Sequence, residues 1–437
     1  MRPSLDRLLG VRAPRALLFV LLATQVAWAG PYKLTVVTDR PEALYAVGEK
    51  ARFQISLQQD DKPVAPAEVA WVLDKDGMPP VQRGTLKLEN GAATIAGSLA
   101  EPGFLTCRVT FTDPERKAVL AIAAAGYDPL KIAPSVPVPD DFDAFRARKK
   151  ADLRAEQPQP ALTPVTSPNA AVDCWDIQVN CLSWRPVSAY LAKPKGAAPK
   201  SLPIILSVHG AGVRSSQLGA AAGLAAGYQA LAMDLNANGI ANGKPDAWYK
   251  EQADTVLRDY RYQGRDDRDK CYFLGMFLRL VRALDYLCAQ PEWDGRRVVV
   301  TGGSQGGGQA LAAAGLDERV TLLCAGVPAI CDHSGKAIGR VNGWPRLVPD
   351  VDGKPDPKIL AVARYFDCQH LATRAKAAAV VSVGFIDGVC PPTSVYAAYN
   401  ALPGKKAIVN ESLMGHSSTP RTGKAMGDAI KAHLAGK

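Results

Sequence analysis

The sequence predicts an α/β domain that follows a smaller all-β domain. Beyond about residue 136, apolar runs of strand length alternate with stretches of helical periodicity, and strands buried on both faces of a parallel sheet have this near-continuous apolar character. Before that point, short β-rich runs are separated by turn residues. Between the two parts, Pro134, Pro137 and Pro139 favour an extended linker, so we place a domain boundary near residue 135.

The first 29 residues have the pattern of a secretory signal peptide. Four arginines and one aspartate lie within residues 1–15, and the apolar run 16–29 ends in the small-residue pattern Ala-Trp-Ala. This run is about 14 residues long, whereas a helix that crosses a bilayer needs about 20. We therefore expect cleavage before Gly30, a secreted or periplasmic protein, and no membrane span after signal cleavage.

The composition is that of a globular protein, with 47% hydrophobic and 22% charged residues among 437. The net charge of +10 falls to about +7 without the signal peptide and comes with no Lys/Arg block, so we expect no nucleic-acid partner. The nine cysteines include no CxxC pair, which argues against a zinc site. Their odd number leaves at least one thiol free, and their spacing selects no disulfide pairing.

The first domain, residues 30–135, has seven β-rich runs at the spacing of an immunoglobulin-like β-sandwich. The runs are 33–38, 51–57, 69–73, 84–88, 92–97, 103–111 and 117–123. The domain holds no histidine and no cluster of reactive groups. We expect it to be a structural or docking module.

The second domain, residues 136–437, alternates strands with helices. Its predicted strands are 187–194, 202–210, 228–234, 296–303, 321–328, 379–385 and 406–412. Its helical candidates are 271–289, 309–316 and 423–434. This alternation predicts a mostly parallel central sheet that is covered by helices on both faces.

A glycine-rich stretch, TGGSQGGG at 301–308, connects a predicted strand to a predicted helix. Its glycines lack the GxGxxG spacing of a dinucleotide-binding loop, and no Lys-Ser/Thr pair follows them as in a P-loop. The stretch does contain GxSxG, and this motif between a strand and a helix is typical of the nucleophile elbow of α/β hydrolases. We predict an α/β-hydrolase fold with Ser304 as the nucleophile. Because GxSxG alone is common by chance, the serine also needs catalytic partners elsewhere in the chain.

A serine hydroxyl needs an adjacent base that is itself oriented by an acid. In α/β hydrolases the chain order is serine, acid, histidine, and the histidine lies on the loop after the last strand. Of the five histidines, only His416 has that position. We expect His433 on the surface of the last helix, and His333 and His370 in a cap or in packing.

The acid is expected at the end of the strand before the last one, where Asp387 lies. Asp387 and His416 therefore complete a predicted triad with Ser304. Asp332, which follows an earlier strand, is the reserve acid if Asp387 only caps a turn.

The oxyanion hole requires two backbone N–H groups, one from the residue after the nucleophile and one from the loop after an early central strand. These residues are Gln305 and, in the stretch VHGAG, Ala211. Gly210 and Gly212 allow the backbone to turn inward, and we expect His209 to brace the loop by hydrogen bonding.

Residues 140–437 resemble the acetyl xylan esterase and cephalosporin C deacetylase family of α/β hydrolases. GGSQGGG matches the family's nucleophile motif, SVGFIDGVCPPTSVYAAYNAL closely resembles its acid segment, and PAICD, YFD and DDFDAFRARKKADL are similar to further family stretches. The resemblance implies the same catalytic residues as the pattern above: Ser304, Asp387, His416, Gln305 and Ala211. It also implies removal of acetyl groups from sugars and related alcohols, with no metal or organic cofactor.

Two departures from the family pattern concern the substrate. The family usually has tyrosine after its HG, where this chain has Ala211. Its Arg-Gly-Gln motif is absent, and MDLNANGIANG offers Asp234, Asn236 and Asn238 instead. The all-β domain is additional to the esterase core, so the ring-shaped oligomers of some relatives are not assumed and the oligomeric state stays open.

Two long connections, residues 237–270 and 331–365, lie beside the expected site and are predicted to form a cap that selects the substrate. Within them, Trp248, Tyr249 and Trp344 are candidates for stacking on sugar rings, with packing anchors as the alternative role. We expect a secreted serine carbohydrate esterase that removes acetyl groups from acetylated xylan or oligosaccharides through an acyl-enzyme. A serine hydrolase for another ester or a peptide, and a non-catalytic binding protein, are the alternatives.

Overall fold

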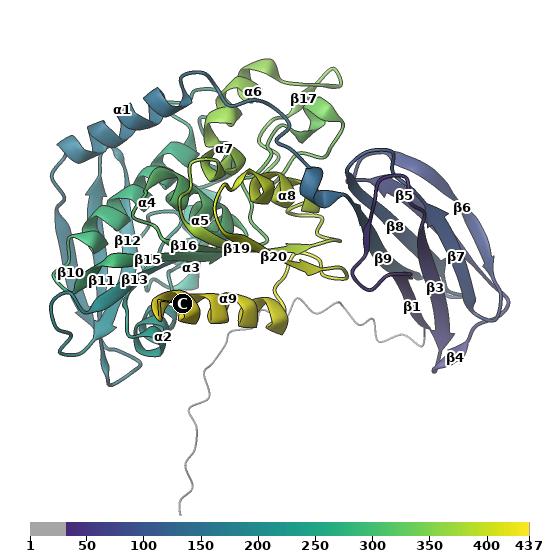
Figure 1. The fold of residues 1–437 in the computed structure, drawn as a ribbon, viewed down its shortest axis with the longest axis horizontal. Helices are drawn as coiled ribbons and strands as arrows, with labels where there is room; N and C mark the ends of the chain where they lie inside the picture. Colours follow the sequence, from purple (N-terminus) through teal and green to yellow (C-terminus); the bar gives the residue numbers. More distant parts are fainter. Residues whose placement is uncertain (1–31, 437) are drawn as a thin grey trace, which may run out of the picture.

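The computed structural model describes residues 32–436, so the predicted signal peptide lies outside the described part (Figure 1). The N-terminal domain contains two sheets that share one hydrophobic core. The first sheet consists of β1 (Tyr32–Thr38), β3 (Ala51–Gln59), β4 (Lys62–Pro63) and β7 (Ala92–Gly97). The second consists of β2 (Leu44–Tyr45), β9 (Ala118–Tyr127), β8 (Gly103–Thr112), β5 (Ala67–Lys75) and β6 (Pro80–Leu88), in that order.

Alternation of side chains explains this core. In β3, Ala51, Phe53, Ile55 and Leu57 are buried between more exposed neighbours, because successive side chains of a strand point to opposite faces. All seven predicted runs form strands. The two-residue strands β2 and β4 were not predicted, since two residues are too short to show a period.

The second domain is built on one nine-stranded sheet, which confirms the predicted mixed α/β structure. Its strand order is β10 (Pro160–Val165), β11 (Val172–Cys181), β12 (Trp184–Pro194), β14 (Leu231–Leu235), β13 (Leu202–Val208), β15 (Trp293–Gly303), β16 (Leu322–Gly326), β19 (Ala378–Gly384) and β20 (Lys406–Glu411). From β14 to β20 every neighbouring pair is parallel, whereas the pairs from β10 to β14 are antiparallel. The prediction missed β10 and β11 because these two strands, at one side of the sheet, have no continuous apolar run.

Helices cover both faces of this sheet (Figure 1). One face carries α1 (Phe142–Ala155), α4 (Tyr272–Cys288), α5 (Gln305–Leu316), α7 (Cys368–Ala372) and α8 (Pro392–Ala401), and the other carries α2 (Leu218–Tyr228) and α9 (Pro420–Leu434). Alternate residues of β13 serve the two faces: Ile204 and Leu206 belong to the core under α4 and α5, and Ile205 to the core under α9. No helix within residues 32–436 is long and apolar enough to span a bilayer.

The two predicted cap segments follow strands of the central sheet. The first, after β14, contains α3 (Asp246–Asp254) and the 3-10 helix η2 (Tyr260–Tyr262). The second, after β16, contains η3 (Gly335–Ile338), β17 (Asp350–Val351), β18 (Lys354–Pro355) and α6 (Pro357–Ala363). Both segments leave the sheet at the carboxyl ends of parallel strands, where sites of α/β proteins form.

The two domains are joined by a buried aromatic contact. Phe104 of β8 is fully buried, and its ring centroid lies 4.9 Å from that of Phe385 and 5.7 Å from that of Tyr396 in α8. Arg340 of the second cap segment adds a 2.9 Å hydrogen bond to the carbonyl of Ala133 in the linker. The N-terminal domain is thus packed against the part of the second domain that contains β19 and α8.

Candidate active site

Ser304 occupies a strained turn between β15 and α5. Its φ of 57° and ψ of −122° are unusual for a residue with a side chain, and such angles hold a nucleophile above the end of its strand. The neighbouring glycines are required by close backbone approach: a Cβ on Gly306 would lie 2.1 Å from the carbonyl oxygen of Val208, and one on Gly307 would lie 2.8 Å from that of Gly326. The turn can therefore form only with glycine at these positions.

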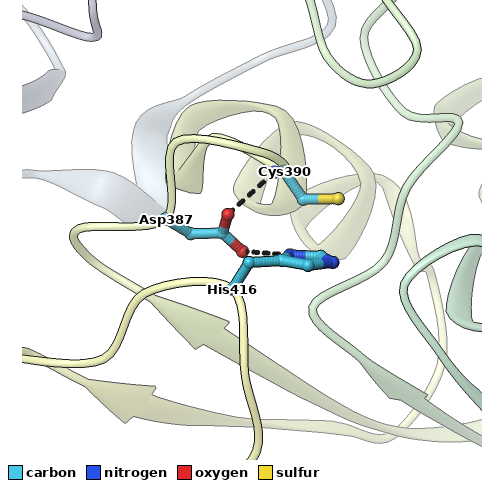
Figure 2. Close-up of side chains that lie close together, drawn as sticks. All are labelled: Asp387, Cys390 and His416. Carbon is cyan, nitrogen blue, oxygen red and sulfur yellow. Dashed lines mark hydrogen bonds and ion pairs between the residues drawn. The ribbon is translucent and has the colours of Figure 1, made fainter. Parts of the chain in front are cut away.

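His416 joins Ser304 to Asp387 in one hydrogen-bond chain. The imidazole Nε2 lies 2.9 Å from the Ser304 Oγ, and Nδ1 lies 2.8 Å from the Asp387 Oδ2. With the proton on Nδ1, the ring donates to the carboxylate and accepts from the serine hydroxyl, which is the arrangement of an activated nucleophile. Figure 2 shows the Asp387 carboxylate directed at the imidazole.

The sheet brings these three residues together. Ser304, Asp387 and His416 follow β15, β19 and β20, which run in parallel and end at the same edge. The Asp387 carboxylate is held by the backbone N–H groups of Val389 and Cys390, at 2.8 and 2.9 Å from Oδ1. Its orientation is therefore fixed by the turn that it begins.

Asp332, the reserve acid, has a different environment. Its carboxylate forms a 2.9 Å ion pair with Arg340 and accepts a hydrogen bond from the Ser135 hydroxyl. It contacts none of the atoms of the Ser304–His416 pair, and burial raises its pKa. Asp332 thus holds the linker against the second cap segment, and Asp387 is the carboxylate beside His416.

The two predicted oxyanion loops lie against each other. Gln305 begins α5, and the first N–H groups of a helix have no acceptor within the helix. The opposite loop contains Ala211, and a Cβ placed on its neighbour Gly210 would lie 3.5 Å from the Ser304 Cβ and 3.3 Å from the Gly303 carbonyl oxygen. The backbone of both loops therefore lies close to Ser304, which is where an oxyanion hole requires its donors.

His209 braces the second of these loops. Its Nδ1 lies 2.7 Å from the Gly210 carbonyl oxygen, and its Nε2 accepts a 3.1 Å hydrogen bond from the Ala237 N–H. Burial, together with the charge of Arg214, lowers the pKa of His209 to about 4. The ring is therefore neutral at pH 7 and can keep both hydrogen bonds.

Tyr260 is a site residue that the sequence analysis missed. Its hydroxyl donates a 2.6 Å hydrogen bond to the Gln305 Oε1 and accepts a long one, 3.5 Å, from the Gly212 N–H. Asn238 holds the same loop through a 2.7 Å hydrogen bond to the Gly212 carbonyl, and Tyr272 orients Asn238 at 2.6 Å. No motif connects Tyr260 to Gln305 in the sequence, because they meet only after the first cap segment folds over α5.

One group of side chains near the triad could hold a metal ion. Ligand atoms of Asp387, Cys390 and His416 lie within 4.8 Å of one another, and within residues 32–436 no second group of this kind occurs. Figure 2 shows the thiol beside the imidazole. Burial raises the pKa of Cys390 well above its ordinary value, so the thiol stays protonated, and the other two members already serve the chain to Ser304. Asp387 and His416 are thus engaged in the chain to Ser304, and the protonated Cys390 thiol is a poor metal ligand.

The three aromatic candidates for sugar stacking differ in accessibility. Tyr249 is 6% exposed, and its hydroxyl donates to the Ala241 carbonyl and accepts from the Lys244 N–H. The predicted stacking of Tyr249 on a sugar ring is therefore wrong, and the alternative role as a packing anchor applies. Trp248 and Trp344 are partly buried and pack against the main core, with one part of each side chain open.

The remaining histidines lie away from the triad. His333 and His370 are buried at the base of the second cap segment, as expected for packing residues. His433 is not a free surface residue of α9, because its Nε2 lies 2.8 Å from the Thr321 Oγ1. This contact attaches α9 to the sheet. No sequence pattern predicts it.

Comparisons with known proteins agree on one family. The family model described as "Acetyl xylan esterase (AXE1)" matches residues 130–426. The acetyl esterase Axe7A of Xylanibacter ruminicola is 30% identical over 419 residues, covering 93% of each chain, so the similarity extends into the N-terminal domain.

Two solved structures share the fold of the second domain. An acetyl xylan esterase from Paenibacillus sp. R4 is 27% identical with a TM-score of 0.59, and covers 70% of this chain and 98% of its own. Acetyl xylan esterase 1 from Thermoanaerobacterium sp. JW/SL YS485 is 24% identical with a TM-score of 0.60, and covers 70% and 97%. Both lack a counterpart for about the length of the N-terminal domain.

Proposed function

The chain belongs to the acetyl xylan esterase family, and is thus a carboxylic ester hydrolase; from this premise we propose that it removes acetyl groups from acetylated xylan or xylo-oligosaccharides through an acetyl-enzyme on Ser304. The observation that carries the proposal is the unbroken hydrogen-bond chain from Asp387 through His416 to Ser304. Relatives named acetyl xylan esterase support the choice of substrate.

The first half of the cycle acetylates the serine. The Ser304 Oγ attacks the ester carbonyl while its proton passes to Nε2 of His416, 2.9 Å away. The resulting oxyanion accepts hydrogen bonds from the N–H groups of Gln305 and Ala211, and Asp387 stabilises the imidazolium. His416 then gives its proton to the sugar oxygen, which leaves as an alcohol.

The second half releases acetate. Water gives a proton to His416 Nε2 and attacks the acetyl-Ser304 carbonyl, and collapse of the second tetrahedral intermediate returns the proton to Ser304. The same two N–H groups stabilise the oxyanion again. The protein's own residues supply every proton transfer and every charge stabilisation in this sequence.

We further propose that residues 1–29 export the enzyme to the periplasm or the medium, where polymeric xylan is found. The N-terminal domain, which we propose to be immunoglobulin-like, remains attached as a structural module. Its two sheets and the buried contact of Phe104 with Phe385 support this role.

Acetate release tests the proposed function. Wild type, Ser304→Ala and the exposed-serine control Ser98→Ala are compared on acetylated xylan, acetylated xylo-oligosaccharides, 4-nitrophenyl esters of increasing acyl length, and peptides. We expect Ser304→Ala to lose roughly 10⁴- to 10⁶-fold in kcat and Ser98→Ala to keep full activity. Activity retained by Ser304→Ala would remove the mechanism, and activity confined to long-chain esters or peptides would replace the substrate.

A further inference from the structure

Arg214 lies beside the oxyanion loop and forms no ion pair with a carboxylate of residues 32–436. A Cβ placed on Gly210 would be 3.8 Å from the Arg214 Nη2 and 3.5 Å from the Ser304 Cβ, and one on Gly212 would be 3.6 Å from Nη1. The guanidinium therefore lies within a few ångströms of the nucleophile turn. The side chain is exposed to solvent.

Arg346 lies on the other side of the triad, at the acid turn. Its Nη2 donates a 3.1 Å hydrogen bond to the carbonyl of Gly388, the residue after Asp387, and its side chain is also exposed. Its positive charge opposes the rise that burial causes in the pKa of the Cys390 thiol, which lies next to His416. The second cap segment thus places one exposed arginine beside the acid turn.

Neither arginine has a carboxylate partner among residues 32–436. Two other arginines of the cap segments do have one: Arg340 pairs with Asp332 at 2.9 Å, and Arg268 pairs with Asp141 at 2.7 Å. Burial raises the pKa of Asp234 to about 6, and the nearby Arg214 charge opposes this rise, but the hydrogen bonds to the Asp234 carboxylate come from the Ser207 hydroxyl and, at 2.7 Å, from the Gln217 N–H. Two guanidinium groups without an ion-pair partner in the described chain therefore lie near the nucleophile.

We propose that Arg214 and Arg346 bind an anionic substituent of the substrate, the carboxylate of an acidic sugar such as a uronic acid carried by the acetylated oligosaccharide. Guanidinium groups present planar pairs of donors that match a carboxylate, and hydrogen bonds between charged partners are stronger than neutral ones. The inference rests on the proposed function, because it specifies which acetylated chains the same Ser304 site prefers. The acetylated sugar lies at Ser304 and its acidic neighbour reaches one of the two arginines.

The two arginines lie at different positions relative to the scissile ester. Arg214 follows the oxyanion loop, on the side of the acyl oxygen, whereas Arg346 lies over the turn that begins at Asp387. A carboxylate on one side of the scissile ester therefore meets Arg214, and one on the other side meets Arg346. Either contact lowers KM by binding a part of the substrate that does not react.

The test uses two acetylated xylo-oligosaccharides that differ only in a uronic acid side group. The full-length wild type is compared with Arg214→Gln, Arg346→Gln and the double variant. Arg296→Gln is the matched control, because Arg296 is exposed and lies near the start of β15, at the opposite end of the strand from Ser304. Arg214→Lys and Arg346→Lys keep the charge, and thermal unfolding of each variant establishes that it is folded.

We expect the wild type to prefer the acidic oligosaccharide in kcat/KM, and the double variant to lower the acidic-to-neutral ratio about tenfold or more, mainly through KM. Addition of about 1 M NaCl, where the Debye length is about 3 Å, should reduce the wild-type preference, and the lysine variants should retain part of it. Arg296→Gln should leave the ratio unchanged.

Two results would overturn the inference while leaving the proposed function intact: a wild type that hydrolyses both oligosaccharides equally, or variants that lose activity on both in the same proportion. Failure of the wild type to release acetate from either oligosaccharide would overturn the proposed function itself, together with this inference.

Discussion

The Tyr260 hydroxyl donates a 2.6 Å hydrogen bond to the side chain of Gln305, the residue that follows the nucleophile. The same oxygen is 3.5 Å from the Gly212 N–H on the opposite loop. One phenol, buried at 6% exposure, thus connects the two backbone segments whose N–H groups are proposed to stabilise the oxyanion. Tyr260 does not touch the reacting atoms and acts as a positioning residue.

Tyr260→Phe should therefore lower kcat about tenfold with little change in KM, because the loops matter most when the oxyanion forms. Steady-state kinetics with 4-nitrophenyl acetate measure both constants. Tyr262→Phe is the matched control, since its hydroxyl binds the Pro345 carbonyl at 2.9 Å and neither oxyanion loop. Equal losses in the two variants would show that Tyr260 only stabilises the cap segment.

Substitution by asparagine should have different effects at the two candidate acids, Asp387 and Asp332. Asp387→Asn should keep the fold and lower kcat by about 10⁴, because the amide favours the wrong tautomer of His416. Asp332→Asn should leave kcat of the folded enzyme near wild type but lower the free energy of unfolding by about 3 kcal/mol, because Arg340 loses its buried partner. Urea unfolding and acetate release distinguish the two. A large kcat loss in Asp332→Asn with unchanged stability would exchange their roles.

The sequence located the triad geometry because each member follows a strand. Ser304 is the first residue after β15, Asp387 the third after β19 and His416 the fifth after β20, and these parallel strands end at one edge of the sheet. Chain order and strand position were therefore enough to bring them together. The GxSxG turn added the one local signal, since a Cβ on Gly302 or Gly306 would lie less than 3 Å from backbone atoms, at 2.6 and 2.1 Å.

Contacts between distant segments could not be predicted from the sequence. Tyr260 reaches Gln305 across 45 residues, and His433 reaches Thr321 across 112, with no periodicity or motif to connect them. Burial of Tyr249 was also not predicted. An aromatic residue in a polar segment suggests exposure, yet the Tyr249 ring is buried and its hydroxyl donates a hydrogen bond to the Ala241 carbonyl. Burial in irregular segments depends on the surrounding packing, which composition does not encode.

Phe104→Ala should weaken both stability and catalysis. The ring fills the contact between the N-terminal domain and Phe385, which lies two residues before Asp387. Removal of a buried phenylalanine costs about 3–5 kcal/mol, and here the cavity lies behind the acid turn, so we expect kcat to fall severalfold. Phe111→Ala is the matched control, because Phe111 is buried in the same strand but only in the core of the N-terminal domain. If both variants keep wild-type kcat in the folded state, the domain contact has no role in catalysis.

Asp76 should make stability fall as the pH rises. Its carboxyl is buried beside β8, where Oδ1 accepts a 2.7 Å hydrogen bond from the Phe104 N–H and Oδ2 has no partner among residues 32–436, and burial raises the pKa to about 7. Between about pH 4 and 7 the folded protein then binds more protons than the unfolded chain, so the free energy of unfolding decreases with pH across that window and stays low above it. Asp76→Asn cannot ionise and should be more stable than wild type by about 1–4 kcal/mol at pH 8, with the difference lost at pH 4. Thermal unfolding at both values measures this, with the exposed Asp61→Asn as control. A difference that is the same at both pH values would mean that Asp76 is not the titrating group.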